Sequence, residues 1–103
     1  MAKLKLNPDE VSFLRGVPIP TPWGESDPVA FTFRYRTETQ LQEWLSNRDQ
    51  TAVELVLSCV TGWDLDDEFS SENVATLCDH YPGAVGAIVS AYAEGCRGAR
   101  EKN

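Results

Sequence analysis

The stretch VAFTFRYRTETQLQEWL, residues 29–45, contains the change of hydrophobic period that decides the fold. In its first half, aromatic residues occupy every second position, namely Phe31, Phe33 and Tyr35. The positions between them are polar, namely Thr32, Arg34 and Arg36. Because successive side chains of a strand point to opposite faces, this alternation predicts a half-buried strand. We expect its aromatic residues to face inward and its arginines to be solvated.

The second half of the stretch predicts a helix over residues 38–46. Thr37 is followed three positions later by Gln40, which is the pattern of a capping box at a helix N-terminus. Leu41 and Trp44 then recur at helical spacing, so we expect Trp44 in the core. A strand that runs directly into a helix indicates a fold that mixes both kinds of element.

A second strand is expected upstream, over residues 11–20 (VSFLRGVPIP). Pro18 and Pro20 remove two backbone donors from it, which suits a strand at the edge of a sheet. Residues 21–28 (TPWGESDP) are rich in turn formers, so the two strands should form an antiparallel hairpin. Residues 2–6 (AKLKL) also alternate and offer a third strand. Since a lone hairpin is marginally stable, its apolar face must lie against the rest of the chain.

A second helix is expected over residues 50–61, with Asp49 as its N-cap and Gly62 as its C-terminal stop. This segment is rich in β-branched residues, so a strand is the alternative interpretation. Its length favours the helix, because buried strands usually span about 4–8 residues.

Two more helices complete the expected fold. Ser70 is a candidate N-cap for a helix with four apolar residues on one face, namely Val74, Leu77, Cys78 and Tyr81. Pro82 separates it from a last helix with apolar positions at Val85, Ile88, Val89, Tyr92 and Cys96. The small residues between 83 and 91 either pack internally or admit a partner helix.

The sequence therefore predicts an α+β fold, in which an N-terminal antiparallel β-hairpin or small sheet packs on a C-terminal bundle of about four helices. We expect a single domain over residues 1–103. Its hairpin region spans residues 1–36, its helical region spans residues 37–100, and residues 101–103 form a frayed tail.

Charge is concentrated in the middle of the chain. The net charge is −7, and residues 37–80 alone carry ten acidic residues and one basic residue. A nucleic-acid surface needs a basic stripe, so we expect no nucleic-acid partner. No apolar run approaches the ~18–20 residues of a membrane span, and residues 1–10 lack an apolar signal segment. The three cysteines have no CxxC spacing, which predicts reduced thiols and neither a disulfide framework nor a zinc site.

Motifs for catalysis or metal binding are missing from the sequence. His80 is the only histidine, and neither a nucleophile elbow nor a phosphate-binding glycine loop is present. The acidic stretch GWDLDDEFSSEN, residues 62–73, fails as a calcium loop, since Phe69 and Ala75 occupy the positions that need glycine and glutamate. We therefore expect no cofactor, no metal and no enzymatic activity. A hydrolase that uses paired carboxylates remains the alternative.

The same acidic stretch has two further interpretations. It either connects two helices with solvated charge or offers an acidic surface to a basic segment of a partner. Trp63 either caps the core from outside or contacts that partner. Trp23, in the loop of the hairpin, either folds back over the hairpin or contacts a partner. The candidate partner-binding residues are therefore Trp23, Trp63, Asp64, Asp66, Asp67 and Glu68.

Four segments of the chain also occur in a characteristic order. They are GVPIPTP (16–22), VAFTFRYRTETQLQEW (29–44), GWDLDDEFSSENVATLCDHYPGAVGAIVSAYAEG (62–95) and the ending AREKN (99–103). Over residues 11–103 this order resembles that of phage tail assembly chaperones. The resemblance rests on combined order and not on one catalytic signature.

The resemblance implies a non-catalytic protein that binds the tape-measure protein and tail-tube subunits while a phage tail is built. It implies work in the cytoplasm of the bacterial host and absence from the mature virion. Self-association is a further expectation. The alternative interpretation is a small phage or bacterial regulatory or adaptor protein that binds another protein.

Overall fold

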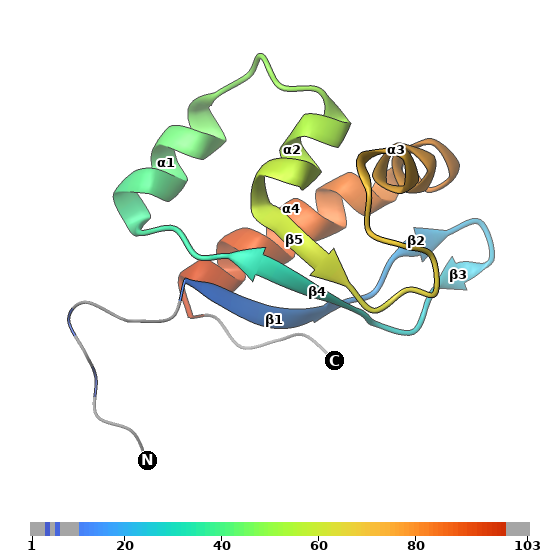
Figure 1. The fold of residues 1–103 in the computed structure, drawn as a ribbon, viewed down its shortest axis with the longest axis horizontal. Coiled ribbons are helices and arrows are strands. Elements are labelled where there is room, and N and C mark those ends of the chain that lie inside the picture. The colour runs from blue at the N-terminus through green and yellow to red at the C-terminus, as the bar shows by residue number, and fades with distance from the viewer. Residues whose placement is uncertain (1–3, 5, 7–10, 99–103) are drawn as a thin grey trace.

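The fold is a small antiparallel sheet with helices gathered against it (Figure 1). The computed structural model describes residues 4, 6 and 11–98. The main sheet has the order β1-β4-β5, formed by β1 (Ser12–Val17), β4 (Val29–Arg34) and β5 (Val60–Trp63). A separate two-stranded hairpin is formed by β2 (Pro20–Thr21) and β3 (Gly24–Glu25). The helices are α1 (Glu38–Ser46), α2 (Ala52–Cys59), α3 (Ser71–His80) and α4 (Gly83–Cys96). The predicted α+β architecture is confirmed.

Strand register places the aromatic residues of the sheet on the face that meets the helices. Phe13 of β1 lies opposite Phe33 of β4, and Phe31 of β4 lies opposite Trp63 of β5. Phe31 and Phe33 are fully buried, as the alternation in the sequence predicts. The neighbouring position Leu14, on the other face of the sheet, is exposed. Within β4, Thr32 is half-buried and Arg34 is exposed, so the period of two holds over residues 31–34.

The third strand of the sheet is the main correction to the sequence-based prediction. Residues 50–61 are predicted as one helix, whereas the structure turns residues 60–63 into β5. Gly62 does not stop a helix but pairs with Thr32 of β4. Val60 is β-branched and buried, so it satisfies a strand as well as a helix. The free edge of β4 decides between the two, and local periodicity does not reveal that edge. Of the strand proposed within residues 2–6, only Leu4 and Leu6 are among the described residues, and neither of them is in a strand.

Helix α2 also begins later than predicted. The expected N-cap at Asp49 is wrong, because Thr51 caps the helix. The Thr51 hydroxyl accepts a hydrogen bond from the Glu54 backbone at 3.2 Å, and the Glu54 carboxylate accepts one from the Thr51 backbone at 2.9 Å. This reciprocal pair is a capping box, whose Thr-x-x-Glu pattern is present in the sequence.

The other predicted caps are confirmed. Thr37 and Gln40 form the capping box of α1, with hydrogen bonds of 3.3 and 2.9 Å. Ser70 caps α3 by accepting a hydrogen bond from the Asn73 backbone at 3.1 Å. Local sequence therefore fixes where these helices begin.

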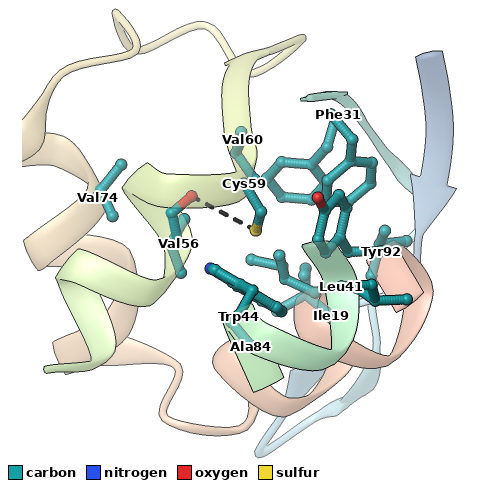
Figure 2. Close-up of a cluster of buried hydrophobic side chains, with 13 residues drawn as sticks. Ile19, Phe31, Leu41, Trp44, Val56, Cys59, Val60, Val74, Ala84 and Tyr92 are labelled. Carbon is teal, nitrogen blue, oxygen red and sulfur yellow. Dashed lines mark hydrogen bonds between the residues drawn. The ribbon is translucent and has the colours of Figure 1, made fainter. Parts of the chain in front are cut away.

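The core is a single cluster between the sheet and the helices (Figure 2). Tyr92 of α4 lies at its centre and is fully buried. Its ring centroid lies 5.3 Å from that of Phe33, 6.3 Å from that of Phe13 and 5.0 Å from that of Trp44. Tyr92 thus joins β1, β4 and α1 to α4, and the predicted core position of Trp44 is confirmed.

Arg36 departs from the expected solvated face. Its guanidinium Nη1 donates a hydrogen bond of 2.8 Å to the Tyr92 hydroxyl. The guanidinium carbon also lies 5.2 Å from the ring centroid of Trp44, within range of a cation–π contact. Because β4 ends at Arg34, the alternation that would turn Arg36 outward no longer applies. For the same reason Tyr35, expected inside, is exposed.

Several small residues of α4 let it pack closely against the rest of the fold. A Cβ on Gly83 would lie 3.2 Å from Pro20, and a Cβ on Gly95 would lie 2.5 Å from the ring of Phe13. Ala84 is fully buried. Gly95 therefore lets α4 approach β1 closely.

Two glycines of α4 should respond in opposite directions to the same change. Gly95→Ala should destabilise the protein by about 1–2 kcal/mol, because the new methyl group overlaps Phe13. Gly86→Ala should stabilise it by about 0.5–1 kcal/mol, because Gly86 is exposed with open space around its Cα. Urea unfolding measures both. Equal effects of the two changes would contradict the close approach at Gly95.

Removing the Tyr92 hydroxyl should separate packing from hydrogen bonding. Tyr92→Phe keeps the ring contacts but leaves Arg36 without its acceptor, so we expect a loss of about 1–2 kcal/mol. Tyr35→Phe, at an exposed position, is the matched control and should be nearly neutral.

The same variant should change the response to alkaline pH. Burial raises the pKa of the Tyr92 hydroxyl above its usual range, so the folded protein keeps a proton that the unfolded chain loses. Stability attributable to this group therefore falls as the pH rises above about 10. Urea unfolding on either side of that pH should show a smaller loss for Tyr92→Phe than for the unchanged protein. An identical loss in both would count against the raised pKa.

Candidate partner-binding groove

The β2–β3 hairpin, the loop between β5 and α3, and helix α3 lie at the same end of the molecule (Figure 1). Residues of these segments line a groove. Its volume is about 460 Å³, which lies within the range of ~300–1,000 Å³ typical of ligand pockets. Most of its lining is apolar. The apolar side chains that line it are Ile19, Val29, Phe31, Trp63, Leu65, Leu77 and Tyr81.

Trp63 forms the wall between the core and the groove. Its ring packs edge-on against Phe31 at 6.4 Å and against Phe69 at 5.1 Å between centroids. Its indole Nε1 donates a hydrogen bond of 2.8 Å to the backbone carbonyl of Asp67. Trp63, the last residue of β5, therefore packs on the outside of the core, which is one of its two predicted placements. The rest of its side chain lines the groove.

The acidic loop, defined as residues 64–68, is held in place by hydrogen bonds. The backbone N–H of Asp64 donates to the carbonyl of Ala30 at 3.1 Å. The Asp64 carboxylate in turn accepts from the Ala30 N–H at 3.0 Å. At the other end of the loop, the Asn73 side chain donates to the Glu68 carbonyl at 2.6 Å. The acidic loop therefore connects a strand to a helix, not two helices as predicted, and its backbone is fixed at both ends.

The carboxylates of this loop are of two kinds. Asp64 serves the structure, since it extends the pairing of β4 with β5. Asp66, Asp67 and Glu68 are exposed, and no hydrogen bond or ion pair joins their carboxylates to another side chain in the described part of the chain. Among the described residues that line the groove, none is Lys or Arg. Asp67 is the acidic residue among these lining residues, and Asp66 and Glu68 are its neighbours in the chain. We refer to residues 66–68 as the lip of the groove, and this lip is negatively charged.

Trp23 stands at the tip of the β2–β3 hairpin and is 83% exposed. It does not fold back over the hairpin, which removes one of its two predicted placements. The Thr21 hydroxyl accepts a hydrogen bond from the Trp23 backbone at 3.1 Å and donates one to the Gly24 carbonyl. Gly24 adopts φ +107°, a conformation that favours glycine. The hairpin thus presents Trp23 on a tight, hydrogen-bonded turn, and Thr21 beside it lines the groove.

Other candidate chemistry is sparse over residues 11–98. His80 is exposed at the end of α3 and lines the groove, but no hydrogen bond links its ring to a described hydroxyl or carboxylate. Burial raises the pKa of the Cys59 thiol to about 12, so it does not form a thiolate near neutral pH. No three described His, Cys, Asp or Glu residues lie together in a way that could hold a metal ion. No helix in the described ranges has the length and apolar character to cross a membrane.

Comparison with protein families identifies the chain. A family model described as phage tail assembly chaperone matches residues 1–103, which is the whole chain. The chain belongs to the phage tail assembly chaperone family. Searches of curated proteins and of solved structures found no match to this member of the chaperone family.

The predicted binding residues fall at one end of this chaperone-family fold. Trp63 and Asp67 line the groove, Asp64, Asp66 and Glu68 share its acidic loop, and Trp23 stands on the hairpin beside it. Sequence reasoning missed the other contributors, among them Leu65, Thr76, Leu77 and His80. One signal was present, because Leu65 is an apolar residue inside an acidic run. No sequence pattern marked the lining residues of α3, because they border the groove only once α3 has packed against the rest of the fold.

The two kinds of carboxylate should separate in stability measurements. Asp64→Ala should destabilise the protein by about 1–2 kcal/mol, because it leaves the Ala30 N–H without its acceptor. Asp66→Ala should change stability by less than about 0.5 kcal/mol, because its carboxylate is exposed. Thermal and urea unfolding test this. Equal tolerance of both changes would mean that Asp64 does not hold the loop.

Proposed function

We propose that this protein is a non-catalytic tail assembly chaperone that binds the tape-measure protein and tail-tube subunits while the tail is built. The observation that carries the proposal is the family match over the whole chain. The partners follow from the resemblance described above, and the groove supplies a surface that suits them.

A chaperone of this kind must cover apolar surface of an unassembled partner and keep the complex soluble. The groove offers apolar contact from Trp63, Leu65 and Leu77. The acidic loop and the overall charge of −7 add solvated charge around it. Binding stabilises the partner conformation that the chaperone recognises, by an amount that grows with the logarithm of the chaperone concentration once this exceeds the dissociation constant.

The contact surface in this proposal is the end of the molecule that carries the predicted residues. The groove accounts for Trp63 and Asp67, and the acidic loop accounts for Asp64, Asp66 and Glu68. Trp23 provides an exposed aromatic anchor, the residue type that most often dominates binding energy at interfaces. The whole chain acts as one domain in this account.

The absence of catalysis is part of the proposal. His80 has no hydrogen-bonded nucleophile or carboxylate beside it in the described part of the chain, and Cys59 is buried with a raised pKa. A binding protein needs neither group. Its work takes place in the cytoplasm of the bacterial host, and it is released before the virion matures.

Co-expression with the tape-measure protein of the same phage tests this function. We expect the tape-measure protein to be more soluble in the presence of the chaperone and to purify with it. The tail-tube protein, tested in the same way, should also be retained. In a glycosidase-type assay, we expect no turnover from the unchanged protein, and therefore no loss of turnover in the Asp66→Asn and Asp67→Asn variants. If neither tail protein is recovered with the chaperone at any salt concentration, the proposal is refuted. That result would favour an adaptor that binds another protein.

A further inference from the structure

We propose that the groove recognises an amphipathic segment of its partner, with apolar side chains that enter the groove and Lys or Arg side chains that meet the acidic loop. The inference rests on the proposed function and specifies the chemistry of the segment that is bound. It follows from three properties of the groove: its apolar surface, its charge and its fixed shape.

The apolar surface of the groove is open and close to the core. Leu65 is 37% exposed, and the half-buried side chains of Trp63 and Leu77 lie in the same lining. Phe31 continues this surface inward to the fully buried sheet face. Apolar side chains that replace water here gain free energy roughly in proportion to the apolar area that they bury.

The charge around the groove selects a basic partner. Asp67 lines the groove, and Asp66 and Glu68 flank it in the chain. All three are exposed, and no described side chain is paired with their carboxylates. On the hairpin side, Asp27 is exposed and directly follows the lining residue Ser26. No described lining residue is Lys or Arg, so a cation that approaches meets no like charge in the lining. Complementary charge raises association rates and rejects acidic segments.

A second copy of this chain is a poor occupant by the same reasoning. It would carry a net charge of −7 and an identical acidic loop to the interface. Like charges placed together repel each other and disfavour that partner. A basic, apolar segment of another protein suits the groove better.

The shape of the groove is set before binding. The indole N–H of Trp63 holds the carbonyl of Asp67, and Asp64 is paired with the Ala30 backbone. The Asn73 side chain holds the carbonyl of Glu68. Because the loop is already ordered, association avoids the entropy cost of ordering it, and this preorganisation favours affinity.

A designed peptide tests the chemistry directly. The probe is a fluorescently labelled amphipathic peptide of leucine and lysine, and its control has glutamate in place of every lysine. We expect binding of the first peptide to weaken at least about tenfold as salt rises from about 50 to 300 mM, because screening removes the contribution of the acidic loop. The glutamate peptide should bind at least about tenfold more weakly at low salt. Equal binding of both peptides would overturn the charge requirement.

Indole signals in a nitrogen–proton correlation spectrum locate the site. The chain has three tryptophans. The Trp63 side chain lines the groove. The Trp44 indole Nε1 instead donates a hydrogen bond of 2.7 Å to the Ser58 hydroxyl, and Trp44 is buried in the core. The lysine peptide should shift the Trp63 signal and leave the Trp44 signal in place. A shift confined to the exposed Trp23 would place binding on the hairpin tip and contradict the groove.

Matched variants test the residues. Leu65→Ala should weaken binding about five- to tenfold, whereas Leu45→Ala should not, although these leucines are similarly exposed at 37% and 40%. Asp66→Lys with Asp67→Lys should weaken binding at least about tenfold and remove the salt dependence. Glu43→Lys with Asp49→Lys makes the same change in net charge away from the groove and is the control. Comparable losses in both charge pairs would show that only overall charge matters, and would overturn the inference.

The same variants distinguish this inference from the proposed function. If the unchanged chain retains the tape-measure protein and the Leu65 and Asp66/Asp67 variants retain it equally well, the chaperone function stands and the groove is not its site. If the unchanged chain retains neither tail protein but binds the lysine peptide through Trp63, the groove chemistry stands and the assigned partners are wrong. Dimers of the free protein that dissociate on adding the peptide would mean that a second copy occupies the groove, and would overturn the argument against self-association.

Discussion

The contact of Tyr92 with the aromatic residues around it joins parts of the chain that the sequence keeps far apart. Its ring packs on Phe33 and Phe13 from the sheet and on Trp44 from α1, while its hydroxyl accepts the hydrogen bond of Arg36. Together these contacts fix the position of α4 against the sheet, and Gly95 allows the approach to be close. Helix α3 packs against both α2 and α4, so its position depends on theirs. The groove depends on this packing, because α3 forms one of its walls.

Trp63 connects this folding constraint to the binding surface. As the last residue of β5 it pairs with Phe31 and closes the core, and its indole also fixes the carbonyl of Asp67 in the acidic loop. The same side chain therefore contributes to stability and shapes the lip of the groove. The four acidic residues beside it divide between these two tasks. Asp64 completes the backbone pairing of the sheet, whereas the carboxylates of Asp66, Asp67 and Glu68 are exposed to solvent and to a partner.

Sequence reasoning succeeded where the determinants are local. The alternation in β4, the capping box at Thr37 and the cap at Ser70 each depend on residues within a few positions of one another. It failed at Val60 to Trp63, because residues with strong β-propensity followed a helical pattern and the choice depended on the distant edge of β4. It also misplaced Arg36, since an alternation cannot show where a strand ends. The candidate site was predicted in part, because its acidic and aromatic residues are conspicuous in the sequence. The lining residues contributed by α3 were not predicted.

By itself the amino-acid sequence determined the α+β class, the family, the beginnings of α1 and α3, and the unusual acidity of the middle of the chain. These properties depend on composition, on periodicity and on short-range hydrogen bonds, all of which can be read along the chain. Only the tertiary structure decided that β5 adds to the sheet, that Trp23 stands exposed, and that Leu65, Leu77 and the acidic loop border one apolar groove. The physical reason is that a surface formed by four separate segments depends on how those segments pack, and packing partners far apart in sequence leave no periodic trace in any one of them.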